Sequence, residues 1–145
     1  MKKKIIVALL VVLILIQFVR VDKKNPPVEL QNDFITLTNP PDEISILLKT
    51  ACYDCHSNET EYPWYFNLAP VSWWAKDHIN DGRKHLNYSI WGTYKPERQA
   101  HKLEEMYSEV EEREMPLLSY TIVHGDAKLT SGQITALTEW LKTVK

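Results

Sequence analysis

The first residues of the chain are far more apolar than the rest. Three lysines follow Met1, and an unbroken apolar run then extends from Ile5 to Ile16 before Arg20 restores charge. Such a run has no polar face to leave in water, so a basic start followed by it is typical of an export signal. We predict that residues 1–24 form a signal-anchor segment and that the body of the protein is exported.

The same segment is expected to stay attached after export. Signal peptidase needs small residues at its cleavage site, and no Ala, Gly or Ser occurs between Ala8 and Ser45. As a helix, residues 5–21 would be about 25 Å long, which is short but spans a bilayer if Lys4 and Arg20 reach the interfaces. The lysines favour the cytoplasmic side. We therefore predict a single-pass protein of a bacterial cell membrane, with its domain on the periplasmic side.

A polar, proline-rich stretch separates this segment from the body. Residues 25–41 contain Pro26, Pro27, Pro40 and Pro41 and are predicted to form a stiff linker. From Asp42 onward, apolar residues recur with the spacing of a helix, with Asp42 as a plausible N-cap. Residues 42–145 are therefore predicted to form the folded domain.

The domain is predicted to be mostly α. Further helices are expected over residues 71–79 and 97–114, with an irregular stretch over 83–95. The helix over 97–114 should stop there because Pro116 disfavours helical backbone at the residue before it. A last helix should follow the capping-box pair Thr130 and Gln133. No segment shows the alternating pattern of a β-strand.

The distribution of charged residues along the chain limits the kinds of partner that the protein can bind. Residues 1–24 carry six Lys or Arg and one Asp, so the remaining residues hold eleven basic and eighteen acidic side chains. Nucleic-acid binding depends largely on basic side chains that contact phosphates, so the acidic body argues against a nucleic-acid partner. The length of 145 residues suits one ordinary domain.

The segment Cys52-Tyr53-Asp54-Cys55-His56 is the strongest functional motif in the chain. Covalent attachment of c-type haem uses this Cys-x-x-Cys-His arrangement. Two cysteines three residues apart lie on one face of a helix, as the two haem vinyl groups require, and the histidine that follows can bind the iron. We predict that Cys52 and Cys55 hold one haem c covalently and that His56 is the proximal iron ligand.

Three other interpretations of the two cysteines are open. A thiol–disulfide redox pair also uses Cys-x-x-Cys, although it usually lies in a βαβ unit, which this sequence lacks. A zinc site would need a second Cys or His pair, and Cys52 and Cys55 are the only cysteines. A structural disulfide would leave His56 unexplained.

Several segments resemble the bacterial haem-binding domain family. They are residues 52–65, the Ala69-Pro-Val-Ser-Trp-Trp segment, the Met115-Pro-Leu-Leu-Ser-Tyr segment, and His124 with Leu129-Thr130. The haem motif is common to all cytochromes c, whereas the tryptophan-rich segment narrows the resemblance to this family. The likeness covers about residues 30–145 and implies a helical, cytochrome c-like fold around one haem. It implies no substrate.

A haem iron bound by His56 has a sixth coordination position, which a second residue of the chain could fill. Met115 precedes a proline at the predicted end of a helix, and a thioether there would favour ferrous iron and raise the potential. We predict Met115 as the distal ligand, with Met106 as a core residue because its spacing is helical. The alternatives are the other histidines of the chain: His78, His85, His101 and His124.

Two functions from different classes fit these residues. A haem with both axial positions filled suits a one-electron carrier without enzymatic activity, whose redox partner the sequence does not identify. A haem with an open or displaceable distal position suits a peroxidase-like enzyme or a sensor of gas or redox state. We predict the carrier.

Overall fold

The computed structural model describes residues 1–144. Its α-helices are α1 (Lys2–Ile16), α2 (Phe34–Thr38), α3 (Asp42–Ala51), α4 (Tyr53–His56), α5 (Val71–His85), α6 (Pro96–Glu111), α7 (Leu118–Thr121) and α8 (Ser131–Leu141). Short 3₁₀ helices lie between them: η1 (Leu30–Asn32), η2 (Trp64–Asn67), η3 (Tyr88–Thr93) and η4 (Gly125–Ala127). No strand occurs within residues 1–144, so the prediction of a mostly α chain is confirmed.

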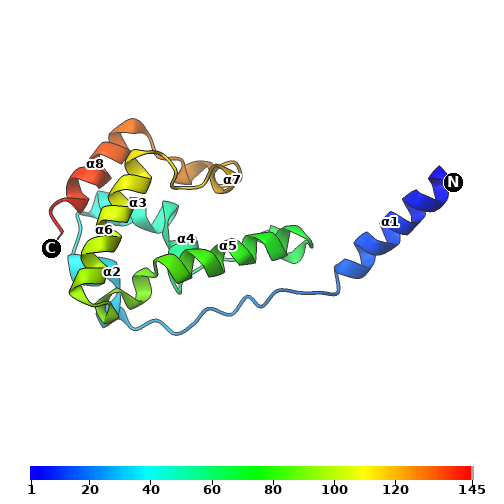
Figure 1. Cartoon of the computed structure of the whole chain (residues 1–145), viewed down its shortest axis with the longest axis horizontal. Helices are drawn as coiled ribbons and strands as arrows, with labels where there is room; N and C mark the ends of the chain where they lie inside the picture. Colours follow the sequence, from blue (N-terminus) through cyan, green and yellow to red (C-terminus); the bar gives the residue numbers. More distant parts are fainter. Residues whose placement is uncertain (145) are drawn as a thin grey trace.

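α1 stands apart from the body of the molecule (Figure 1). It holds 15 residues and none of them is buried. Among the described residues, no helix is long and apolar enough to cross a membrane. The predicted spanning helix over residues 5–21 is therefore not supported, because the helix ends at Ile16 and the chain turns there.

The segment after α1 is hydrogen-bonded to the body rather than free. The side-chain amide of Gln17 donates to the carbonyl oxygen of Ala69 at 2.9 Å and accepts from the Ala69 N–H at 3.0 Å. The indole N–H of Trp73 donates to the carbonyl oxygen of Val19 at 2.9 Å. These bonds fix the base of α1 beside the start of α5.

Part of the predicted linker packs into the domain. Phe34, in α2, has no exposed surface, and its ring lies 4.8 Å from the ring of Trp91 and 5.8 Å from that of Trp140. The Asp33 carboxylate caps α2 by accepting from the N–H of Thr36. Residues 30–38 therefore form part of the folded body and are not a spacer.

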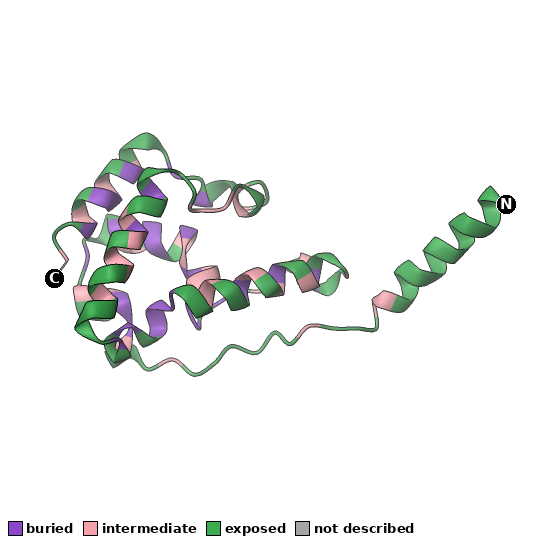
Figure 2. Ribbon diagram, viewed as in Figure 1, coloured by how far each residue is buried: buried purple, intermediate pink, exposed green. Residues whose placement is uncertain are grey.

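The main hydrophobic core lies where α3, α6, α8 and η3 meet, and a smaller one lies between η2 and α5. Figure 2 shows the buried residues concentrated on the facing sides of α3, α6 and α8. In Figure 1, α5 and α7 extend from this part of the molecule toward the side where α1 lies. The fold therefore has a packed end and an end formed by two projecting arms.

The helix ends differ from the predictions in two places. α5 continues to His85, beyond the predicted end at residue 79, because its last turns are polar and carry no apolar period for the pattern to detect. α6 ends at Glu111, before the predicted residue 114, and Arg113 adopts a left-handed φ of 63° that turns the chain. The predicted capping box at the start of α8 is confirmed.

Candidate functional site

A cavity of about 390 Å³ opens between the two arms and the packed end. Its walls come from α3, α4, α5, α6, α8 and the segment from Met115 to Tyr120. Cys52, Cys55 and His56 all line it. The structure therefore brings the whole Cys-x-x-Cys-His motif to one largely apolar cavity, whose size is that of a small-molecule or cofactor site.

The two cysteines are free thiols with little thiolate character. Burial is the main cause that raises the pKa of Cys52 to about 12 and the pKa of Cys55 to about 11. A thiol–disulfide oxidoreductase needs the opposite shift, because the thiolate is its nucleophile. These surroundings argue against the redox-pair interpretation. For the zinc interpretation, no three His, Cys, Asp or Glu side chains within residues 1–144 are placed to share a metal ion.

His56 is held in the form that binds metals. Its Nδ1 lies 3.1 Å from the carbonyl oxygen of Gly82 and 3.1 Å from that of Leu86. Both partners only accept, so Nδ1 must carry the proton, and the lone pair of the neutral ring is then on Nε2. Burial lowers the pKa of His56, which also favours the neutral ring. A backbone carbonyl that orients the imidazole in this way is a regular feature of histidine–metal sites.

Gly82 allows this arrangement, and the sequence analysis missed it. A Cβ atom at this position would lie 2.7 Å from the carbonyl oxygen of Cys55 and 3.2 Å from its carbonyl carbon. These are backbone atoms and cannot swing aside as a flexible side chain would. The absence of a Cβ therefore lets α5 approach α4 closely enough for its carbonyl to reach His56. The predicted helix ended at residue 79, so Gly82 was not recognised as a glycine inside a helix, a costly choice that usually has a packing reason.

Met115 lines the same cavity, from the segment that follows α6. The left-handed Arg113 redirects the chain, and the Met115 N–H donates to the carbonyl oxygen of Glu109 at 3.0 Å. Met106 is buried in the main core, as predicted, but it also lines the cavity. Both thioethers can therefore contact a group bound there.

The four remaining histidines divide into two pairs. His78 and His85, on α5, line the cavity. His101 does not line it; its ring pairs with Glu105 at 3.0 Å, and its side chain is 64% exposed. His124 lies outside it too, stacked on Tyr120 with ring centroids 4.2 Å apart. Of the alternative iron ligands, only His78 and His85 line the cavity that the Cys-x-x-Cys-His motif also lines.

Tyr120 connects the motif to the segment that carries Met115, a link that the sequence analysis did not identify. Its hydroxyl donates to the carboxylate of Asp54, inside the motif, at 2.8 Å. Burial and this bond raise the pKa of Tyr120 well above its usual value. Tyr120 also lines the cavity, five residues after Met115. One hydrogen bond thus ties the segment that carries Met115 to α4, which carries Cys55 and His56.

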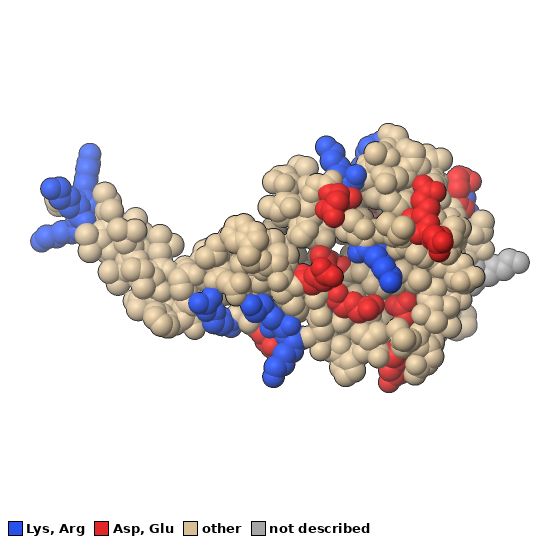
Figure 3. Space-filling view, turned by 180° about the vertical axis from the view of Figure 1, so that it is seen from behind, with Lys and Arg blue, Asp and Glu red and all other residues tan. Residues whose placement is uncertain are grey.

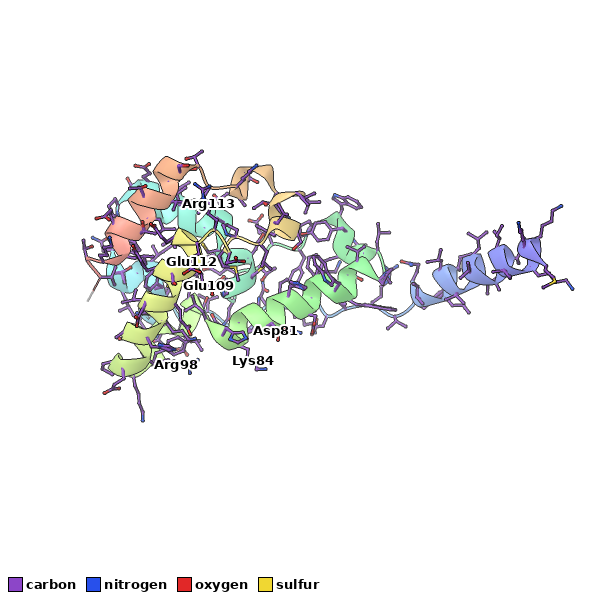
Figure 4. All side chains as sticks on the ribbon, turned by 45° about the horizontal axis from the view of Figure 1, so that its top comes forward. Asp81, Lys84, Arg98, Glu109, Glu112 and Arg113 are labelled. Atoms are coloured by element: carbon purple, nitrogen blue, oxygen red, sulfur yellow. The ribbon has the colours of Figure 1, made fainter. Side chains whose placement is uncertain are left out.

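Charged side chains form the polar part of the cavity lining. Asp81 comes from α5 and Glu109 from α6, and Figure 4 shows these two residues on the two helices that flank the cavity. Lys102 and Glu105 also line it and are paired with each other. The lining is therefore apolar around the motif, with a small set of acidic and basic groups from α5 and α6.

These residues fit a covalently attached haem. Two thiols, an imidazole with its Nε2 lone pair available and two thioethers line one apolar cavity. A family model described as a haem-binding domain matches residues 11–143. No curated protein and no solved structure matches the chain.

Proposed function

The chain belongs to the haem-binding domain family, and on that premise we propose that it is an exported c-type cytochrome that transfers single electrons. The observation that carries this proposal is the placement of Cys52, Cys55 and His56 around one cavity, with the His56 ring held by two carbonyls. A family of haem-binding domains accounts for that combination better than a thiol or zinc site does.

Each residue of the motif has a distinct role in the proposal. The thiols of Cys52 and Cys55 would hold one haem by adding across its two vinyl groups, each S–H hydrogen passing to the vinyl group so that no atom is lost. His56 would supply its Nε2 lone pair to the iron, and the carbonyl oxygens of Gly82 and Leu86 hold its ring through Nδ1. The bound haem supplies an iron that changes its oxidation state by one electron.

Met115 favours the carrier over the enzyme or sensor. It lines the cavity that the Cys-x-x-Cys-His motif also lines, on a segment that Tyr120 ties to Asp54, which supports a thioether ligand for a haem bound there. A second protein ligand would leave no open iron position for peroxide or gas, and a thioether in that role would raise the reduction potential. We therefore propose Met115 as the distal ligand.

The basic and apolar start of the chain supports export. Bacterial haem c is attached outside the cytoplasmic membrane, and residues 1–24 have the composition of an export signal. We propose that this segment directs the domain to the periplasmic side and keeps it at the membrane.

Covalent attachment is tested by producing the full chain in bacteria that assemble c-type cytochromes. We expect haem to stay with the polypeptide on a denaturing gel, and the double variant Cys52→Ala, Cys55→Ala to lose it. His56→Ala should change the absorption spectrum, whereas the matched variant His101→Ala should not, because His101 does not line the cavity. Haem that acid and solvent extract from the unaltered chain would contradict the proposal.

A second measurement separates the carrier from the enzyme or sensor. A carrier with both axial positions filled should show a low-spin spectrum that carbon monoxide leaves unchanged. A high-spin spectrum that responds at once to carbon monoxide would show an open distal site and would overturn the carrier.

A further inference from the structure

The two arms of the body expose large apolar side chains at their tips. On the arm formed by η2 and α5, Trp64 is 73% exposed and Trp74 is 50% exposed, with Leu68 and Val71 exposed between them. On the other arm, α7 and the residues after it expose Leu118, Ile122 and Val123. We call these seven residues the apolar end. Isolated exposed apolar residues are ordinary, but a group of this size marks a contact surface.

The two halves of the apolar end lie side by side. The Tyr65 hydroxyl, in η2, and the Nε2 of His124, just after α7, are joined by a hydrogen bond of 2.9 Å. Figure 1 shows the tips of α5 and α7 at the same end of the body, the end that faces α1. Segments more than forty residues apart in the chain therefore contribute to one surface.

The apolar helix α1 departs from this same end. Gln17 and Val19 are hydrogen-bonded to Ala69 and Trp73, next to the exposed Leu68 and Trp74. Phe18, between them, is 79% exposed. A partner or surface that covers the exposed apolar residues of α1 would therefore lie next to the apolar end.

The two segments that form the apolar end carry no acidic side chain, and the segment after α1 beside them carries Arg20, Lys23 and Lys24 together with Asp22. No Asp or Glu occurs between Glu61 and Asp77, or between Glu114 and Asp126, although the chain holds 19 acidic residues. Arg20 and Lys23 lie at this end, because both donate hydrogen bonds to Asn67 of η2. Figure 3 shows acidic and basic side chains over the body, and mainly basic ones on α1 and the segment after it, where an acidic side chain also lies.

We propose that the apolar end rests on the surface of a lipid bilayer with anionic headgroups. Tryptophan side chains prefer the membrane–water interface, and leucine, isoleucine and valine gain free energy by leaving water. Basic residues beside them are attracted to anionic lipid, each by about 1 kcal/mol. The contact needs no helix that crosses the membrane. The same chemistry disfavours a soluble basic partner at this surface.

Hydrogen exchange of the full chain tests the contact, with vesicles of phosphatidylcholine and phosphatidylglycerol as the probe. We expect vesicles to slow exchange of the backbone amides in residues 64–74 and 118–124, and to leave α3 unchanged. Equal exchange in these segments with and without vesicles would overturn the proposal. Slowing that needs no lipid and grows with protein concentration would also overturn it, in favour of a second copy of the chain.

Substitutions give an independent measurement. The double variant Trp64→Ser, Ile122→Ser should lower the fraction of protein bound to these vesicles several-fold. Ile46→Ser, at a 63% exposed position of α3, is the matched control and should bind as the unaltered chain does. If both variants bind equally, the apolar end makes no contact with lipid. Neither readout depends on how haem is held, so the outcome is separate from that of the proposed cytochrome function.

Discussion

Gly82→Ala tests how closely α5 must approach the haem motif. The new Cβ would lie 2.7 Å from the Cys55 carbonyl oxygen, so one of the two backbones has to move. Overpacking of this kind costs about 1–3 kcal/mol, whereas alanine in place of glycine within a helix gains about 0.5–1 kcal/mol. We expect a lower melting temperature for the haem-loaded protein. The hydrogen bond from His56 to the Gly82 carbonyl should also weaken, which makes the imidazole a poorer donor and raises the reduction potential.

The matched control is Gly132→Ala in α8, where nothing lies within 4 Å of the new Cβ. This variant also replaces a helical glycine with alanine, but without overpacking. Gly82→Ala should therefore have the lower free energy of unfolding of the two, by roughly the overpacking cost of 1–3 kcal/mol. At about 2–4 °C per kcal/mol, thermal unfolding resolves that difference. Equal melting temperatures, together with equal potentials in a redox titration, would refute the argument that a glycine is needed here.

Three further outcomes follow from the site and the core. Met115→Ala should convert a low-spin haem to one that binds carbon monoxide. Met106→Ala should keep the low-spin spectrum and lose about 2–5 kcal/mol of stability, because it truncates a core side chain. The reverse pattern would make Met106 the distal ligand and Met115 the core residue. Phe34→Ala should cost about 3–5 kcal/mol in denaturant unfolding, and a negligible loss would mean that α2 is a spacer after all. Tyr120→Phe removes one partly exposed hydrogen bond to Asp54, so it should cost about 1 kcal/mol and loosen the distal ligand, seen as easier displacement of that ligand by added imidazole.

The elements that the sequence predicted are those with a local signal. The capping box at Thr130 and Gln133 needs only residues three apart, and α8 begins there as expected. Proline-rich flanks suggested a linker, but Phe34 becomes a core residue through contacts with Trp91 and Trp140, which lie more than fifty residues away. The spacing of residues along a segment does not reveal contacts between residues so far apart in the sequence.

In the site, too, the sequence predicted the local features but not the contacts between distant residues. The motif from Cys52 to His56 is contiguous, so its chemistry could be inferred before its geometry was known. The bonds from His56 to Gly82 and from Tyr120 to Asp54 join residues 26 and 66 positions apart, and only the folded chain reveals them. The axial role of Met115 stays a prediction, although its place in the cavity agrees with it.

The two carbonyls that hold His56 lie at the C-terminal end of α5, and this would give the helix an electrical effect on a haem iron bound to His56. The peptide dipoles of a helix sum to about half a negative charge at that end. Oxidation of such an iron would add one positive charge, so the end of α5 would stabilise the oxidised state and lower the reduction potential. A Met115 thioether would act in the opposite sense. The two faces of the haem would then pull the potential in opposite directions, and unwinding the last turn of α5 would raise it with both axial ligands still in place.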